Sequence, residues 1–352
     1  MTDSSSMVVD AAERIFKDLA DPQSIIQSGS NDWRAPLWDE LDAMGLPLAW
    51  VPESLGGFGL GMAEGLAVAR AAGRAALAVP LVETLLAGWI AGKAGLALPQ
   101  GTATVIIAGA KASAELDDTG LLRAQARGVP FASEVQSIVI LAADAPGIKV
   151  AIVSREQCRI DTGQNLAGDA LNNVQIDTQA QTRGKAPGLS LERALYVAAT
   201  CRSLQIAGAL QAILDLSVGY AKERVAFGKP IGKFQAVQQN LARLGGEVAA
   251  AVAVAESAAD TLDHADVPAT HTLLEVASAK IRCGEAAQTG AAIAHQVLGA
   301  IGYTEEHILH RFTLRMLSWR DDYGSEAVWA KRLGEMVRPG SGADLWQLLT
   351  AR

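Results

Sequence analysis

The chain has 352 residues, half of them hydrophobic, and a formal net charge of −8. This length allows two or three domains with a large core, and the acidic balance gives no support for binding nucleic acid. No apolar run approaches the length of an uninterrupted membrane span, and the first residues, MTDSSSMVVDAAERIF, lack the basic and apolar regions of a secretory signal. The cysteines at 158, 201 and 283 show neither metal-ligand spacing nor a disulfide framework. We therefore expect a cytoplasmic protein without a membrane span.

Residues 1–100 are predicted to form an N-terminal helical domain. Trp38, Leu41 and Met44 form a helical stripe that stops at Gly45. The glycine cluster at 56–61 cannot lie inside a regular helix. These glycines shape a loop, and we expect their role to be structural.

Residues 101–185 have a different composition. Short β-branched runs, TATVIIAG, SIVILAA and IKVAIVS, are followed by the weaker run NNVQID, with glycine, proline or aspartate between them. This pattern predicts a small antiparallel β domain. The segment AKASAELDDTGLLRAQA, between Gly109 and Arg127, is not among these runs.

Residues 186–352 are predicted to be helical again. Long periodic segments with short connections favour an antiparallel four-helix bundle, in which Trp319, Trp329 and Trp346 pack the last helices. The predicted helices cover about 189–224, 234–263, 268–299, 304–318 and 325–350.

The stretch from Tyr220 to Leu244 joins two of these helices through a tight turn. Gly228 and Pro230 place the break, because glycine permits unusual dihedrals and proline cannot continue a helix. Arg224 just before the turn has one ordinary interpretation, a cation at a solvated helix end.

A second interpretation comes from resemblance. RVAFGKPIGKFQAVQQNLA resembles the C-terminal-domain motif of the acyl-CoA dehydrogenase flavoprotein family, VPESLGGFGL resembles a segment of its N-terminal helical domain, and HQVLGAIGYTEEH resembles its QxxGGxGY segment. The resemblance implies a mostly α, α+β fold with an N-terminal helical domain, a small middle β-barrel and a C-terminal four-helix bundle. It also implies a homo- or hetero-tetramer with an acyl-CoA dehydrogenase-type subunit.

The resemblance further implies an FAD site. The family's arginine meets the cofactor pyrophosphate, and its motif serves the FAD of the neighbouring subunit. A guanidinium suits phosphate because its donors form a planar fork. In the second motif Ala300 replaces a glycine, and in the middle domain the family's flavin-contacting motifs are not recognisable. The residues implied to bind FAD are Arg224, Ala226, Phe227, Gln235, Gln296, Gly299 and Ser325.

The reaction implied by the resemblance is α,β-dehydrogenation of an acyl-CoA thioester, a step of lipid metabolism, with an electron-transfer flavoprotein or similar acceptor. It needs FAD as hydride acceptor and a carboxylate as base. The family's base, counted without gaps, corresponds to Tyr323, whose phenol is a poor base at neutral pH. A slip of one residue places Asp322 there instead. Alternatively, Asp321 and Asp322 lie at the end of a surface helix.

Two other sets of residues have side chains that could take part in chemistry. The family's second base position corresponds to Ala198, and Glu192 lies six residues too early, roughly 9 Å along a helix. Arg202 is a weak candidate for contact with CoA or a carboxyl group. His307 and His310 form an i, i+3 pair without a third metal ligand at supporting spacing.

The sequence therefore leaves two hypotheses open. In the first, the chain is itself an FAD enzyme with Asp322 or a neighbour as base. In the second, it is a non-catalytic subunit that completes the FAD site of a partner acyl-CoA dehydrogenase.

Overall fold

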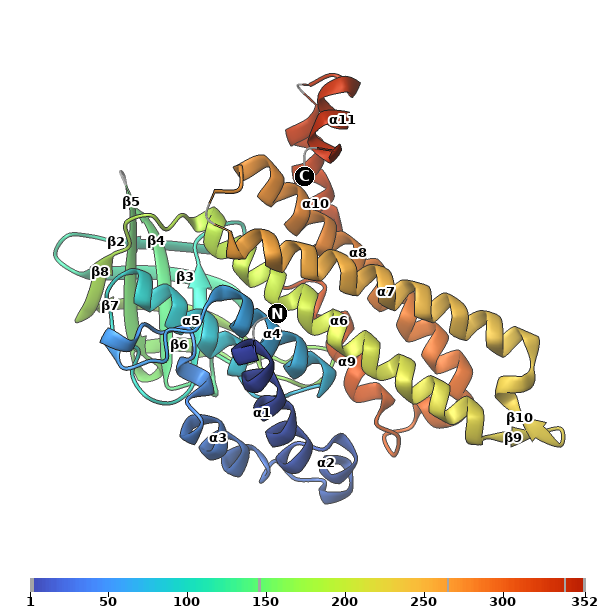
Figure 1. Ribbon diagram of the computed structural model, residues 1–352. Coiled ribbons are helices and arrows are strands. Elements are labelled where there is room, and N and C mark those ends of the chain that lie inside the picture. Colours follow the sequence, from blue (N-terminus) through green and yellow to red (C-terminus); the bar gives the residue numbers. More distant parts are fainter. Residues whose placement is uncertain (1–2, 145–146, 265, 339, 351–352) are drawn as a thin grey trace. The chain divides into compact units, whose positions relative to one another are not determined.

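The computed structural model describes residues 3–144, 147–264, 266–338 and 340–350. The chain forms two compact units, Met1–Ala198 and Ala199–Arg352 (Figure 1). The predicted order of a helical domain, a β domain and a second helical domain is confirmed.

The first unit begins with helices and two short 3-10 turns. Asp21 caps the second helix by accepting a hydrogen bond from the backbone N–H of Ser24 at 2.8 Å, and Gly29 ends it in the left-handed conformation. In the third helix Leu37 and Leu41 are fully buried, whereas Met44 lies beyond the helix end and is 48% exposed, unlike in the predicted stripe. The helices are α1 (Asp3–Leu19), α2 (Pro22–Ser28), α3 (Arg34–Ala43), α4 (Met62–Arg74) and α5 (Leu81–Lys93), with η1 (Leu46–Leu48) and η2 (Glu53–Leu55).

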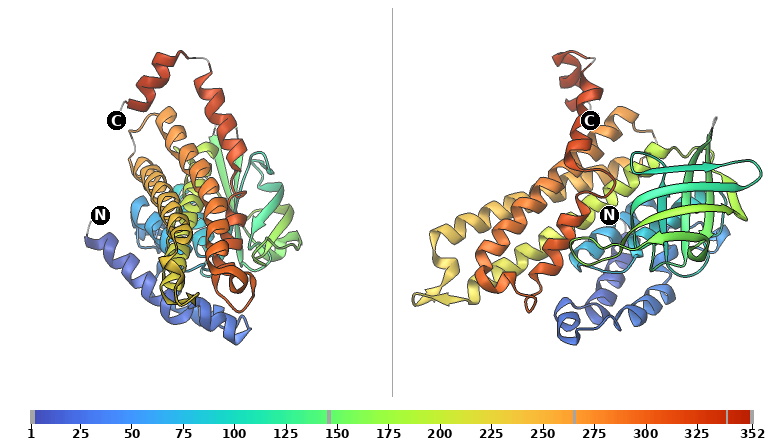
Figure 2. Two further views of the ribbon diagram at one scale, coloured as in Figure 1. Left: turned by 90° about the vertical axis from the view of Figure 1, so that its right-hand side faces the viewer. Right: turned by 180° about the vertical axis from the view of Figure 1, so that it is seen from behind.

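The β domain consists of two four-stranded sheets that pack around one core. The strands of one sheet cross those of the other (Figure 2). Alternating residues point inward, among them Ile138 and Ile140 from one sheet and Leu122 and Val174 from the other. One sheet has the order β1 (Ala103–Ile107), β4 (Ser137–Asp144), β5 (Gly147–Ser154) and β8 (Thr182–Lys185); the other has β2 (Ala112–Leu116), β3 (Leu121–Pro130), β7 (Leu171–Gln179) and β6 (Cys158–Asp161).

Two features of this domain differ from the sequence interpretation. Strands β1 and β4 are parallel, so the expectation of a purely antiparallel domain is wrong at this pair. The chain passes through β2 and β3 in the other sheet before it returns, and a connection of that length permits parallel pairing. The apparently featureless segment AKASAELDDTGLLRAQA supplies the β2–β3 hairpin.

The second unit is a helical domain. Glycine brings its long helices close together, because a Cβ on Gly290 would meet Leu210 at 2.7 Å and Leu244 at 3.3 Å. Trp319 and Trp329 are buried as predicted, but Trp346 is 68% exposed, so its predicted packing is wrong. The helices are α6 (Leu191–Glu223), which begins in the first unit, α7 (Gln235–Asp263), α8 (Ala269–Leu298), α9 (Leu309–Trp319), α10 (Glu326–Val337) and α11 (Gly342–Thr350), with η4 (Ile231–Lys233) and η5 (Gly299–Tyr303).

Helix α6 is long and apolar enough to cross a membrane by length and composition. Its most apolar window is 83% buried inside the fold, as in the core helix of a protein that does not use it as a span. One such helix, mostly buried, is only weak support for a membrane span.

Candidate functional site

A two-stranded hairpin projects between α6 and α7. Strands β9 (Val225–Ala226) and β10 (Lys229–Pro230) pair antiparallel. The two residues between them, Phe227 and Gly228, have φ of +53° and +78°. Positive φ at both positions is typical of a type I′ turn, which glycine accepts and phenylalanine tolerates only with strain.

The side chains of this hairpin face solvent. Phe227 is 96% exposed, and its ring contacts that of Phe234 edge-on at a centroid distance of 6.2 Å. Arg224 and Gln235 are exposed, and their side chains have no hydrogen-bond or ion-pair partner within the described part of the chain. Ala226 is half-buried. The hairpin and the residues beside it therefore present an exposed aromatic ring, together with a cation and an amide that form no side-chain hydrogen bond or ion pair among the described residues.

The second predicted group lies where α8 ends. Gln296 is exposed, with no side-chain hydrogen bond among the described residues. Gly299 has φ +68° and ψ −143°, a conformation essentially restricted to glycine. His295 donates to or accepts from the Thr313 hydroxyl at 3.0 Å and stacks on Tyr303, and burial lowers the pKa of His295. Because α7 and α8 are antiparallel neighbours, this group lies at the same end of the bundle as the hairpin (Figure 1).

The third group is the turn between α9 and α10, where Asp322 lies. The Nε of Arg202 donates to the Oδ2 of Asp322 at 2.9 Å, with the two side chains 3% and 14% exposed. The guanidinium of Arg202 also donates to Gln205 and lies 5.7 Å from the ring centroid of Tyr323. Tyr323 has φ +56°. Ser325 is the N-cap residue of α10, although its side chain makes no capping hydrogen bond.

The first two groups lie at one end of the bundle and the third lies apart from them, so the predicted site residues occupy two places rather than one. The turn with Asp322 lies against Lys280, eleven residues inside α8, whereas Gln296 lies near the C-terminal end of that helix. At 1.5 Å per residue, the stretch of α8 between Lys280 and Gln296 is roughly 24 Å long. Within one chain, Ser325 lies in the same turn as Asp322, but the other residues predicted to bind FAD are not brought together with the residue predicted to act as base.

Lys280 is the main feature of this region that the sequence interpretation missed. It is 1% exposed, and burial lowers the pKa of its ammonium to about 8. A signal was present in the sequence, because Lys280 is the one cation on the α8 face formed by Val276, Cys283 and Ala287.

The remaining candidates do not assemble a site. Ala198 and Ala199 are fully buried and carry no acid. Glu192 lies in the first turn of α6 and accepts a hydrogen bond from the Tyr196 hydroxyl at 2.7 Å. Among the described residues no group of histidine, cysteine and acidic side chains could hold a metal ion.

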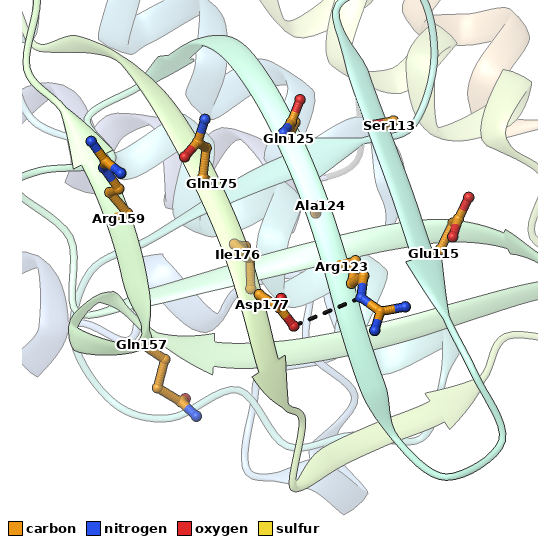
Figure 3. A pocket seen from close by; sticks show the side chains of 10 residues that line it. All are labelled: Ser113, Glu115, Arg123, Ala124, Gln125, Gln157, Arg159, Gln175, Ile176 and Asp177. Carbon is orange, nitrogen blue, oxygen red and sulfur yellow. Dashed lines mark ion pairs between the residues drawn. The ribbon is translucent and has the colours of Figure 1, made fainter.

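The outer face of the β2–β3–β7–β6 sheet carries an open hollow of about 590 Å³ (Figure 3). Its side chains alternate with core residues along each strand, and Arg123 and Asp177 form an ion pair at 3.8 Å across two strands. Such alternation is ordinary for the solvated face of a sheet. Its polar residues are Ser113, Glu115, Arg123, Gln125, Gln157, Arg159, Gln175 and Asp177.

The chemistry of the hairpin and the α8 end fits the pyrophosphate of FAD. Arg224 supplies a guanidinium fork, Gln235 and Gln296 supply amides, and a Cβ on Gly299 would meet no atom within 4 Å. The flat, exposed ring of Phe227 adds an apolar contact surface beside the cation.

Comparison with known proteins matches two family models. Residues 2–95 match the acyl-CoA dehydrogenase N-terminal domain, and residues 189–336 match the acyl-CoA dehydrogenase C-terminal domain. The chain is 31% identical over 293 residues to acyl-CoA dehydrogenase IpdE2 of Mycobacterium tuberculosis, which covers 79% of each chain. It is 28% identical over 343 residues to acyl-CoA dehydrogenase FadE34 of the same organism, covering 93% of this chain and 46% of that protein.

The fold agrees with that of a solved structure, the ChsE4–ChsE5 complex from Mycobacterium tuberculosis. The TM-score is 0.85 at 22% identity, with 97% of this chain and 99% of that chain covered. Both terminal regions match the family models, and one relative shares more than 30% identity over most of its length. The chain therefore belongs to the acyl-CoA dehydrogenase family.

Proposed function

We propose that this chain takes part in FAD-dependent α,β-dehydrogenation of an acyl-CoA thioester as one subunit of a complex, in which it completes the FAD site of a partner acyl-CoA dehydrogenase. Family membership supports the oxidoreductase reaction and FAD as its cofactor. When bound, FAD supplies the hydride acceptor that no amino-acid side chain can provide.

One observation carries the proposal. The exposed hairpin with Arg224 and Phe227 is separated by much of the length of α8 from the turn with Asp322. A cofactor bound at the hairpin of this chain therefore needs its catalytic carboxylate from another chain, which is either a second copy or a different subunit. In this role Arg224 binds and orients the pyrophosphate, and Phe227 covers an apolar part of the bound cofactor.

The environment of Asp322 agrees with this division of labour. A general base must direct a free lone pair at the proton that it removes. The Oδ2 of Asp322 accepts from the buried guanidinium of Arg202, which leaves only Oδ1 for that role, and Tyr323 occupies the position aligned with the family's base.

Likeness to a complex of two different chains supports a heteromeric partner. We propose an acyl-CoA dehydrogenase-type subunit for that role, and an electron-transfer flavoprotein or similar protein as the electron acceptor of the complex. The second candidate function is that of a self-sufficient enzyme with Asp322 as base, which is favoured by the place of this carboxylate one residue before the aligned position.

The deciding experiment is to purify the chain alone and together with acyl-CoA dehydrogenase-type chains of the same genome, and to record visible spectra. We expect the isolated chain to lack a flavin band and the co-purified complex to show one that acyl-CoA bleaches. A flavin band that acyl-CoA bleaches in the isolated chain would overturn the proposal in favour of the self-sufficient enzyme.

A pair of variants tests the part played by the hairpin. Arg224→Gln should weaken FAD binding by the complex about 10- to 100-fold, because a charge-assisted hydrogen bond to phosphate is lost. Lys222→Gln removes a neighbouring exposed cation and should leave FAD affinity unchanged. Equal FAD affinity in Arg224→Gln and the unmodified complex, measured by flavin fluorescence titration, contradicts the assignment.

A further inference from the structure

The ammonium of Lys280 is bound by the backbone of a single turn. Its Nζ donates to the carbonyl oxygens of Trp319 at 3.3 Å, Arg320 at 3.0 Å and Asp322 at 2.8 Å. A lysine ammonium has three N–H donors and no acceptor. All of its hydrogen-bonding capacity is therefore used on the turn that ends α9.

The position of these carbonyls explains why a lysine side chain can be buried there. The last carbonyl groups of a helix have no partner within the helix and form the negative end of its dipole. Lys280 reaches the end of α9 from the buried face of α8. It therefore takes the place of the solvent or glycine cap by which helices usually end.

The same turn is held from other directions. Arg202 from α6 binds the side chain of Asp322, Glu326 from α10 accepts from Arg320 at 2.6 Å, and Trp329 donates to the carbonyl oxygen of Tyr323 at 3.2 Å. Gly284 in α8 makes room for Glu326, because a Cβ there would lie 2.0 Å from its carboxylate.

These bonds surround a strained residue. Tyr323 has φ +56°, a conformation that costs free energy for any residue except glycine and persists only where neighbouring contacts enforce it. Its ring lies beside the guanidinium of Arg202. Tyr323 is also the residue at the position aligned with the family's base, so the geometry of this turn decides what the chain presents there.

We infer that Lys280 is a positioning residue, whose ammonium fixes the backbone of residues 319–323 and thereby sets the positions of Asp322 and Tyr323. Lys280 has this role whichever chain of the complex carries the base. A buried lysine thus fixes the conformation of this turn through hydrogen bonds to three of its carbonyl groups.

Lys280→Met tests the inference, because methionine keeps the apolar stem and removes the donors. The carbonyl groups of Arg320 and Asp322 are only partly buried, so water can replace the lost hydrogen bonds and the variant is expected to fold. Lys331→Met, at a lysine whose side chain is 76% exposed in α10, is the matched control.

The readout is ¹⁹F NMR of the full chain labelled with 3-fluorotyrosine, together with hydrogen exchange of its amides. The chain has four tyrosines, and Tyr323→Phe identifies the resonance of Tyr323. In Lys280→Met we expect this resonance alone to shift or split, and the amides of residues 320–325 to exchange about 10- to 100-fold faster. In Lys331→Met neither readout should change.

Two results would overturn the inference. In one, Lys280→Met leaves both the Tyr323 resonance and the hydrogen exchange of the amides of residues 320–325 unchanged. The other is a uniform change in all four resonances and in exchange across α6, α7 and α8, which would make Lys280 a general core residue. If Lys280→Met does not fold, Lys280→Gln replaces it. The side-chain amide of glutamine has two N–H donors on a shorter stem, so the amides of residues 320–325 should again exchange faster than in the unmodified chain. Unchanged exchange of these amides in a folded Lys280→Gln variant also contradicts the inference.

Discussion

Asp322 is a candidate base by sequence, but its role in the fold depends on a residue far away in the chain, Arg202. Arg202 lies in the core of the second unit and is 3% exposed on its side chain. Its guanidinium needs a counterion there, since an isolated buried charge is strongly unfavourable. Asp322 supplies that counterion, and this explains its position without any reference to proton transfer.

The variant Asp322→Asn separates the two roles. We expect turnover of the complex, expressed per bound flavin, to fall by less than about tenfold, whereas loss of a general base lowers rates about 10²- to 10⁴-fold. Stability should fall by about 3–5 kcal/mol, because Arg202 loses its buried partner. Steady-state kinetics and urea unfolding measure the two effects, with Asp321→Asn as the exposed neighbouring control. A loss of more than about 10³-fold in turnover confined to Asp322→Asn identifies Asp322 as the base.

At the scale of elements, small residues set how closely the long helices approach. Gly290 of α8 faces Leu210 and Ile213 of α6 and Leu244 of α7. Gly245 of α7, only one residue beyond Leu244, faces open space, because a Cβ added there would meet no atom within 4 Å. The two glycines have the same helical backbone but opposite surroundings.

Alanine substitutions at these glycines should change stability in opposite directions. Gly290→Ala places a methyl group 2.7 Å from Leu210 and is expected to lower the free energy of unfolding by about 1–3 kcal/mol. Gly245→Ala should raise it by up to about 1 kcal/mol, because alanine loses less backbone entropy in a helix. Urea unfolding followed by circular dichroism compares them, and a Gly290→Ala variant as stable as the unmodified chain contradicts the close packing.

At the scale of the whole molecule, Lys280 links stability to pH. Burial lowers its pKa from 10.5 to about 8, against the opposing attraction of Asp322 and Glu326 and with further repulsion from Arg202. The neighbouring Cys283 thiol, whose pKa burial raises to about 12, stays protonated through this range. Between these two values for Lys280 the unfolded chain binds more protons than the folded chain, so the free energy of unfolding rises with pH.

We expect the contribution of Lys280 to the free energy of unfolding to grow by up to roughly 3 kcal/mol between pH 8 and pH 10.5. Other groups titrate in the same range, so the measurement is the difference between the unmodified chain and Lys280→Met in urea unfolding at several pH values. Lys331→Met should follow the unmodified chain. A pH-independent difference between the unmodified chain and Lys280→Met contradicts the assignment.

The sequence predicted those features that depend on local pattern. Periodic apolar residues located the long helices, and Gly228 and Pro230 located the hairpin between two of them. Strands β2 and β3 were missed because their alanine-rich and charged sequence has low β propensity, and pairing with β7 decides their conformation.

Contacts between distant parts of the chain could not be predicted in this way. Nothing near Asp322 in the sequence indicates Arg202, and nothing near Lys280 indicates the end of α9. The parallel pairing of β1 with β4 likewise depends on the path of the intervening hairpin. The residues predicted to bind pyrophosphate came from a motif, and their role remains a proposal.

The hairpin has a consequence for the chain before it meets its partner. Phe227 is almost fully exposed and Val225 beside it is also exposed, so the hairpin of the single subunit presents apolar surface to solvent. Exposed apolar groups favour aggregation and recognition by the machinery that removes unassembled proteins. Under the proposed function, the supply of partner would therefore set how much of this chain survives in the cell, and the two subunits would accumulate in matched amounts without any dedicated regulator.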